Sequence, residues 1–224
     1  FPPSTVKSLI QSLETSPYIG NIILMTHFAN ADEAIGVRDQ LALFNKVVDD
    51  SFDRSVANSA AIIRYPETHM EWVRPGIMLY GASPFEDQSS KDIGLQPVMS
   101  LHSNIIAVQN LDKGQSVGYG STFVATNKTR VGIVACGYAD GYPRHAPSGT
   151  PVMVAGKISR TLGRVSMDML YVDLTDIPSA DIHSEVELWG ENISVDEVAK
   201  EAKTVGYELL CAISSSIRVP MEYA

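Results

Sequence analysis

The chain has 224 residues, 45% of them hydrophobic and 19% charged, which is enough to bury a core and to form one large or two small domains. Seventeen Lys and Arg against 26 Asp and Glu give a formal net charge of -9, which opposes binding to nucleic acid or to an anionic membrane surface. The longest apolar runs, such as 22–25 and 131–136, are far shorter than the roughly 18 residues of a membrane span. We therefore predict a globular protein with no nucleic-acid partner and no membrane span.

The two cysteines and the first residues bear on the location and extent of the protein. Cys136 and Cys211 lie far apart and have no metal-binding spacing, which favours reduced thiols in the cytoplasm and leaves a disulfide open. The chain starts at Phe1 without a methionine and runs directly into a Pro-Pro-Ser helix start. We expect the chain to come from the middle of a larger protein.

Helix and strand patterns alternate over about the first 80 residues. Apolar periodicity and the turn residues Ser, Pro and Gly separate the elements. The predicted elements are helices over 4–15, 32–50 and 59–64 and strands over 22–25, 55–57 and 72–80, the last broken by Pro75-Gly76. Parallel strands are buried on both faces and need more partners than three strands supply, so this part is predicted to be the end of an eight-stranded α/β barrel.

Short β-type runs separated by Gly, Pro, Asp and Asn follow residue 94 and predict a mostly β domain. The predicted strands are 101–108, 122–125, 131–135, 152–155 and 170–174. Ser194 and Glu197 have the spacing of a capping box and start a helix that continues to about 204. A further short helix is predicted over 207–213.

Four polar clusters follow predicted strands, where an α/β barrel places its functional residues. His27 follows the strand 22–25 and is either a catalytic or a structural histidine. Ser59 opens a helix and either binds a phosphate or caps the helix. Arg74, beside the flexible Gly76, offers a permanent positive charge, or is a surface arginine on a turn. Tyr119 lies between two glycines and either acts in proton transfer or packs in the core.

Two further loops combine glycines with mixed charges, 137–144 and 163–168. Each of these loops could be a turn only.

Taken together and in their order along the chain, the motifs resemble the alanine racemase family over Asn21 to Val219. The motifs that carry the resemblance are Thr26-His27-Phe28-Ala29, Ala31-Asp32-Glu33, Asn58-Ser59, Arg74-Pro75-Gly76-Ile77, Tyr80-Gly81, Gly118-Tyr119-Gly120, Gly137-Tyr138-Ala139-Asp140-Gly141, Gly163-Arg164 and Met167-Asp168.

The resemblance implies an α/β plus β fold, in which the C-terminal part of a pyridoxal-phosphate-binding (β/α)8 barrel of the TIM type precedes a mostly β domain. It implies a boundary near residue 95, with domains over 1–95 and 96–224, and a head-to-tail homodimer with shared active sites. The implied activity is the interconversion of L-alanine and D-alanine by a bacterial isomerase. The products would supply D-alanine for cell-wall peptidoglycan or L-alanine for catabolism.

The resemblance also implies roles for single residues. Tyr119 would be the base that acts on the Cα of L-alanine at the other subunit's cofactor, Arg74 the partner of the pyridine nitrogen, and His27 a hydrogen-bond partner of both. Met167 would bind the substrate carboxylate through its backbone amide. The residues implied at the cofactor phosphate are Ser59, Gly76 and Ile77. The residues implied at the entrance are Asp32, Tyr138, Arg144 and Arg164.

These roles are chemically consistent. Racemisation needs bases on both faces of a planar carbanion, and a tyrosine, whose ordinary pKa is about 10, needs cationic neighbours to act as one. An arginine at the pyridine nitrogen disfavours protonation of the ring and limits side reactions such as transamination.

The chain departs from the family pattern at two places, upstream of the matched motifs and at residue 217. The family's cofactor-binding lysine has an Ala-Tyr-Gly-His context that none of the eight lysines shares, namely Lys7, Lys46, Lys91, Lys113, Lys128, Lys157, Lys200 and Lys203. An upstream arginine for the substrate carboxylate is missing as well. Ile217 stands where many members have a phosphate-binding tyrosine, before Arg218-Val219-Pro220.

Two alternatives to an alanine racemase stay open. The chain could be a non-catalytic module that dimerises or binds pyridoxal phosphate, or part of a racemase that also accepts serine or basic amino acids. Because the lysine is missing, the 224 residues alone are expected to be inactive. An open parallel sheet also predicts poor solubility.

Overall fold

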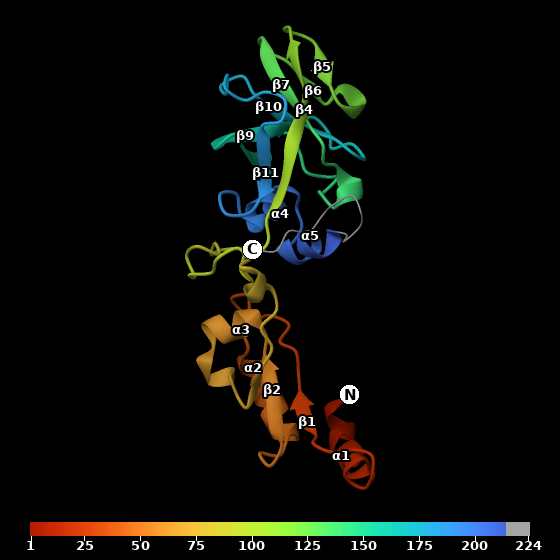
Figure 1. Ribbon diagram of the computed structural model, residues 1–224. Coiled ribbons are helices and arrows are strands. Elements are labelled where there is room, and N and C mark those ends of the chain that lie inside the picture. The colour runs from red at the N-terminus through yellow and green to blue at the C-terminus, as the bar shows by residue number, and fades with distance from the viewer. Residues whose placement is uncertain (214–224) are drawn as a thin grey trace. The chain divides into compact units, whose positions relative to one another are not determined.

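The computed structural model describes residues 1–213 and divides the chain into two compact units (Figure 1). The first unit comprises Phe1–Leu79 and Pro84–Gln88, and the second comprises Tyr80–Ser83 and Ser89–Ala224. Each unit has its own sheet. Ile217 lies outside the described residues.

The first unit contains a parallel sheet with the order β1-β2-β3. Its strands are β1 (Ile23–Met25), β2 (Asp53–Ala57) and β3 (Trp72–Val73). Its helices are α1 (Val6–Glu14), α2 (Arg38–Val47) and α3 (Ser59–Arg64), with 3-10 turns over Pro3–Thr5 and Pro66–Thr68. The register pairs Met25 with Ser55 and Ser55 with Trp72, so the carboxyl ends of the three strands lie at one edge.

Two sequence predictions for this unit were wrong in their bounds. The helix expected over 32–50 begins only at Arg38, because 32–37 forms turns with Gly36 at a φ of +68°. The strand expected over 72–80 ends at Val73, since Pro75 has no N–H to donate to a neighbouring strand, and a 3-10 turn follows over Ile77–Tyr80.

Ser59 does not cap helix α3, contrary to the structural alternative for this residue. The N-cap is Asn58, whose extended backbone lets its side chain accept a hydrogen bond from the Ala61 amide at 3.0 Å. The Ser59 hydroxyl is therefore available for contacts outside the helix.

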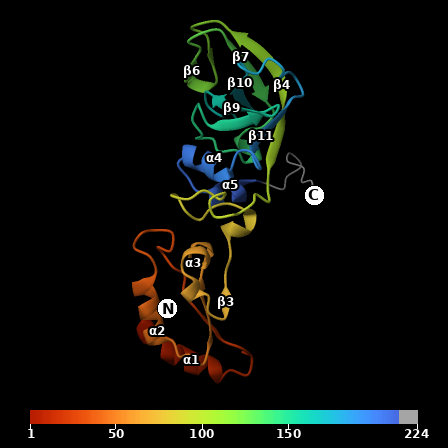
Figure 2. The same ribbon diagram turned by 90° about the vertical axis from the view of Figure 1, so that its left-hand side faces the viewer.

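The second unit is built on a closed antiparallel barrel with the strand order β10-β7-β4-β11-β8-β9. The barrel strands are β4 (Leu101–Leu111), β7 (Thr129–Val134), β8 (Pro151–Val154), β9 (Lys157–Leu162), β10 (Leu170–Asp173) and β11 (Glu185–Trp189). The long β4 pairs with both β7 and β11, and Figure 2 shows β4 beside β11. Buried aliphatic side chains such as Ile105, Val154 and Leu188 fill the barrel core.

A hairpin and two helices complete the second unit. The hairpin pairs β5 (Ser116–Val117) with β6 (Phe123–Val124). Helices α4 (Val195–Glu201) and α5 (Gly206–Ala212) lie together at one end of the barrel in both views (Figures 1 and 2). The predicted capping box is confirmed, because the Ser194 hydroxyl and the Glu197 carboxylate bond to each other's backbone amide.

Cys136 is buried, Cys211 is exposed, and both are free thiols. Of the helices in residues 1–213, none has the length and hydropathy needed to cross a lipid bilayer.

Candidate active site

Arg74 follows β3 and is held by oxygen atoms from the two neighbouring strands. Its Nη1 donates to the Ser55 carbonyl at 2.6 Å and to the Ser55 hydroxyl at 2.8 Å, and its Nη2 donates to the Thr26 carbonyl at 3.0 Å. Ser55 belongs to β2, and Thr26 comes directly after β1. The parallel register therefore creates the cluster, because it brings the ends of three strands to one edge of the sheet.

All of these acceptors are neutral. Within residues 1–213, Arg74 forms no ion pair with a carboxylate, and its Nε–H has no hydrogen-bond partner. Partial burial lowers the pKa of Arg74 from its ordinary value, but a guanidinium keeps its proton at any physiological pH. The cluster thus presents an uncompensated positive charge and one free donor.

His27 lies against this guanidinium. Its Nδ1 is 3.4 Å from Arg74 Nη2, and its Nε2 is 3.5 Å from the Asn58 side-chain nitrogen. Both of these neighbours can only donate a hydrogen bond, and a neutral imidazole has one accepting nitrogen. The cationic Arg74 guanidinium is a stronger donor than the neutral Asn58 amide. We therefore assign Nδ1 as the acceptor and place the ring proton on Nε2.

Ser59, Gly76 and Ile77, which the family resemblance places at a phosphate, lie close together. The Gly76 amide donates to the Ser59 hydroxyl at 2.8 Å, and the side chains of Ser59 and Ile77 are buried. The Ile77 amide has no partner among the described residues. A hydroxyl and a free amide thus converge beside the Arg74 turn, an arrangement that suits a phosphate oxygen.

In the second unit, Tyr119 stands on a loop with unusual backbone angles. Gly118 and Gly120 have φ values of +77° and +73°, and Ser121 has +48°. Such angles are readily adopted by glycine but strained for other residues. The adjoining hairpin is anchored because Val117 and Phe123 pack against the barrel core. Tyr119 is therefore 70% exposed on a loop whose adjoining hairpin is anchored to the barrel.

The loop 163–169 gathers the other candidate residues of this unit. A Cβ on Gly118 would lie 3.3 Å from the Arg164 amide nitrogen, so the Tyr119 loop approaches 163–169 closely. On the other side, the Tyr138 amide donates to the Ser166 carbonyl at 3.1 Å. Gly137 permits this second approach, since a Cβ there would be only 2.3 Å from the Met167 carbonyl oxygen. One loop therefore sets the spacing of Tyr119 and Tyr138.

The remaining predicted residues differ in how far the structure brings them together. The Met167 amide has no hydrogen-bond partner within residues 1–213, so it is free to donate to a substrate. The Arg144 guanidinium lies 5.9 Å from the centre of the Tyr138 ring, at the limit of a cation–π contact.

Asp32 belongs to the first unit, where its carbonyl accepts from Arg64 at 2.8 Å. A common entrance of Asp32 with the second-unit residues stays a prediction, as does the contact between His27 and Tyr119.

Two family models match the sequence and cover nearly all of it. The model for the alanine racemase N-terminal domain matches residues 1–84, and the model for the alanine racemase C-terminal domain matches residues 98–223. The chain belongs to the alanine racemase family.

Individual members of this family are similar over the whole chain. Alanine racemase from Thiobacillus denitrificans is 54% identical over 99% of this chain and 60% of its own length, and that from Burkholderia mallei is 52% identical over 99% of this chain and 63% of its own length. The chain therefore spans about three fifths of the length of the curated relatives that it matches.

Solved alanine racemases have the same fold. The biosynthetic alanine racemase from Pseudomonas aeruginosa is 48% identical and has a TM-score of 0.95 over 100% of this chain and 63% of that chain. The alanine racemase from Acinetobacter baumannii is 42% identical, with a TM-score of 0.86 over 93% of this chain and 59% of that chain. The predicted fold class, strands of an α/β barrel followed by a mostly β domain, is confirmed.

Two residues of the first cluster were missed by the sequence predictions. Ser55 is buried and gives Arg74 two acceptors, and its signal was a polar residue in an otherwise apolar strand end. Gln40 lies on α2 and binds the 26–29 loop through its side-chain amide. Nothing in the helical pattern around Gln40 distinguishes it from a surface glutamine.

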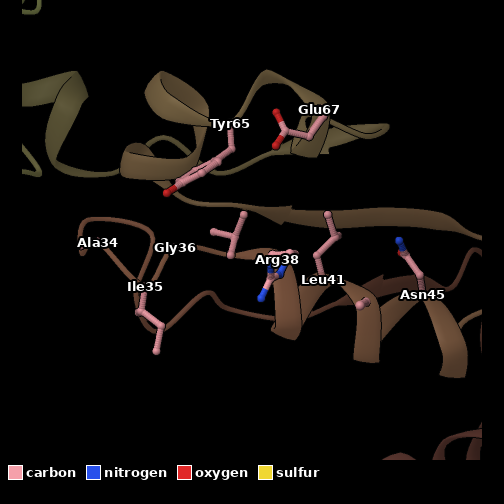
Figure 3. A pocket seen from close by; sticks show the side chains of 10 residues that line it. Ala34, Ile35, Gly36, Arg38, Leu41, Asn45, Tyr65 and Glu67 are labelled. Carbon is pink, nitrogen blue, oxygen red and sulfur yellow. The ribbon is translucent and has the colours of Figure 1, made fainter.

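A separate shallow pocket lies between α2 with the loop before it and the segment from Tyr65 to Glu67 (Figure 3). Figure 3 shows Tyr65 and Glu67 on one side and Ile35 on the other. None of the candidate residues predicted from the sequence lines this pocket. It is therefore distinct from the Arg74 cluster.

Proposed function

We propose that the protein containing this chain is an alanine racemase that interconverts L-alanine and D-alanine with pyridoxal 5'-phosphate as its cofactor. The family membership supports the reaction class. The observation that supports pyridoxal phosphate as the cofactor is the state of the Arg74 guanidinium. Three neutral oxygens hold it in place, while its charge stays uncompensated and its Nε–H stays free.

The residues present fit this cofactor. Ser59, Gly76 and Ile77 would hold the phosphate, because a buried hydroxyl and a free amide converge there. Arg74 would donate to the pyridine nitrogen and, since it keeps its proton, would leave that nitrogen unprotonated. Bound pyridoxal phosphate would supply an electron sink for the charge left on the substrate Cα when its proton is removed.

The other candidate residues act on the substrate. Tyr119 would remove or return the proton at Cα, and its exposure on a fixed loop leaves the hydroxyl accessible. The free Met167 amide would bind the substrate carboxylate. His27, whose Nδ1 lies against Arg74, would form hydrogen bonds to both Arg74 and Tyr119. Tyr138, Arg144, Arg164 and Asp32 would line the entrance.

We further propose a homodimer in which Tyr119 of one subunit serves the cofactor of the other.

A domain boundary near residue 95 fits the gap between the two family matches, because the N-terminal match ends at residue 84 and the C-terminal match begins at residue 98. A cytoplasmic location, and a role in D-alanine supply for peptidoglycan or in L-alanine catabolism, stay predictions. The name of the Pseudomonas aeruginosa structure, a biosynthetic alanine racemase, supports the supply role for a relative.

The test is a racemisation assay on the full-length protein that carries this chain. With added pyridoxal phosphate, chiral chromatography is expected to show conversion of L-alanine to D-alanine, with slower turnover of L-serine and L-lysine. The 224 residues alone are expected to be inactive and to gain activity when a lysine-bearing segment is added. Absence of racemisation by the cofactor-loaded full-length protein would refute the proposed function.

A further inference from the structure

The side chain of Gln40 makes three hydrogen bonds to the loop that carries His27. Its Nε2 donates to the Thr26 hydroxyl at 3.1 Å and to the His27 carbonyl at 2.6 Å. Its Oε1 accepts from the Ala29 amide at 3.1 Å. An amide has two N–H donors on one side and an acceptor on the other, so these contacts use both of its N–H groups and its oxygen.

These contacts define a single orientation of the amide. A flipped amide would set its NH2 group against the Ala29 N–H and its oxygen against the His27 carbonyl, which opposes donor to donor and acceptor to acceptor. Gln40 therefore fixes the path of the backbone from Thr26 to Ala29. Phe28, in the middle of this segment, is buried and adds a second anchor.

Two of the three residues that Gln40 binds, Thr26 and His27, also contact Arg74. The Thr26 carbonyl accepts from Arg74 Nη2 at 3.0 Å, and His27 Nδ1 lies 3.4 Å from the same nitrogen. Gln40 holds the hydroxyl of Thr26 and the carbonyl of His27, while Arg74 contacts the carbonyl of Thr26 and the ring of His27. A shift of this segment would move both partners of Nη2 together.

We propose that Gln40 is a positioning residue that aims Arg74 and His27 at the cofactor through Thr26. The inference rests on the proposed function, in which Arg74 meets the pyridine nitrogen. Gln40 itself touches neither cofactor nor substrate. Its contribution is to hold the Thr26 carbonyl where it directs one end of the guanidinium, while Ser55 holds the other.

The test compares Gln40→Leu with Asn45→Leu in the full-length, cofactor-loaded protein. Both changes replace an amide on helix α2, but Asn45 is exposed and has no hydrogen bond to the 26–29 loop. Gln40→Leu is expected to lower kcat about 10- to 100-fold with the KM for alanine changed less than about twofold, since a small displacement of a catalytic group costs rate more than binding. It is also expected to shift the absorption band of bound pyridoxal phosphate. Asn45→Leu is expected to match the wild type.

A second pair of variants covers the case in which Gln40→Leu does not fold. Thr26→Val removes the hydroxyl that accepts from Gln40 and is expected to lower kcat about fivefold, the size of one lost hydrogen bond. Thr26→Ser keeps the hydroxyl and is expected to restore the wild-type rate and spectrum.

The outcomes separate the two proposals. If the wild type neither binds pyridoxal phosphate nor racemises alanine, the proposed function fails and the role of Gln40 fails with it. If the wild type is active, a wild-type kcat and spectrum in Gln40→Leu, or in Thr26→Val when Gln40→Leu does not fold, would overturn the role of Gln40 alone. A loss of activity that follows the folded fraction, with an unchanged spectrum, would also overturn it.

Discussion

In the first unit, the candidate ligand-binding residues come from the ends of adjacent parallel strands, whereas in the second unit they come from loops between antiparallel strands. Ser55, Thr26 and Arg74 meet because the sheet register pairs their strands. Tyr119 and Tyr138 are spaced by a third loop, 163–169, that lies against both. A strand-end site depends on register, and a loop site depends on close backbone approach.

The two units also treat charge differently. Arg74 has neutral partners only, so its charge remains available for a ligand. Glu187, buried in the second unit, accepts hydrogen bonds from the Asn192 amide, the Asn192 side chain and the Ile193 amide. Its charge is satisfied within the fold. We therefore propose a functional role for the charge of Arg74 and a structural role for the charge of Glu187.

The largest expected effect comes from the loop site. Tyr119→Phe removes the proposed base while keeping the ring, and we expect kcat for alanine to fall about 10²- to 10⁴-fold. Cofactor affinity should stay unchanged, because the residues proposed to bind the phosphate lie in the first unit. Steady-state kinetics and a cofactor titration check both points. Near-normal turnover in Tyr119→Phe would contradict its role as base.

Arg74→Lys tests whether the strand-end site depends on the shape of the guanidinium as well as on its charge. One ammonium group cannot reach Ser55 and Thr26 and also offer a free donor, so we expect a loss of about 100-fold in kcat. Ser55→Ala removes a single acceptor and serves as the milder comparison. Equal rates for Arg74→Lys and the wild type would show that charge alone suffices.

Gly137→Ala tests the close approach that the loop site needs. The new methyl group would collide with the backbone at Ser166 and Met167, and we expect it to destabilise the second unit by about 1–3 kcal/mol. Gly20→Ala is the control, because its φ lies outside the left-handed region and nothing lies within 4 Å of a Cβ there. Urea unfolding followed by Trp189 fluorescence, in a Trp72→Phe background, measures the difference. Equal losses in both variants would show that the approach at Gly137 adds nothing.

The smallest expected effect concerns the pH dependence of Glu187. Burial by itself would raise the pKa of Glu187, but the hydrogen bonds from Asn192 and Ile193 outweigh it and lower the pKa. A lowered folded-state pKa means stability that is present above the unfolded pKa and is lost as pH falls through the folded one.

We therefore expect Glu187→Gln to be less stable than the wild type by about 1 kcal/mol at pH 7. The difference should shrink as pH falls below about 4. Urea unfolding at several pH values measures it. A difference that is constant from pH 7 to pH 3 would show that the charge of Glu187 does not matter.

Local signals in the sequence were sufficient for several elements. Helix α3, strand β1 and the Ser194 to Glu197 capping box are where their patterns predict them, because short-range periodicity and side-chain capping decide them. Strands β9 and β11 were missed. Their charged residues, such as Lys157 and Glu187, break the apolar runs that predict strands, and only the closed barrel pairs them.

The sequence by itself determined the family, the α/β plus β fold class and the residues proposed for the site, since ordered motifs carry that information in the chain. Tertiary structure alone decided that Arg74 has neutral partners and that Gln40 holds the 26–29 loop. These facts depend on strand register and on contacts between residues 10 to 50 positions apart. Spacing along the chain does not encode which side chains meet at that range, because packing and hydrogen bonding select the partners only after the chain has folded.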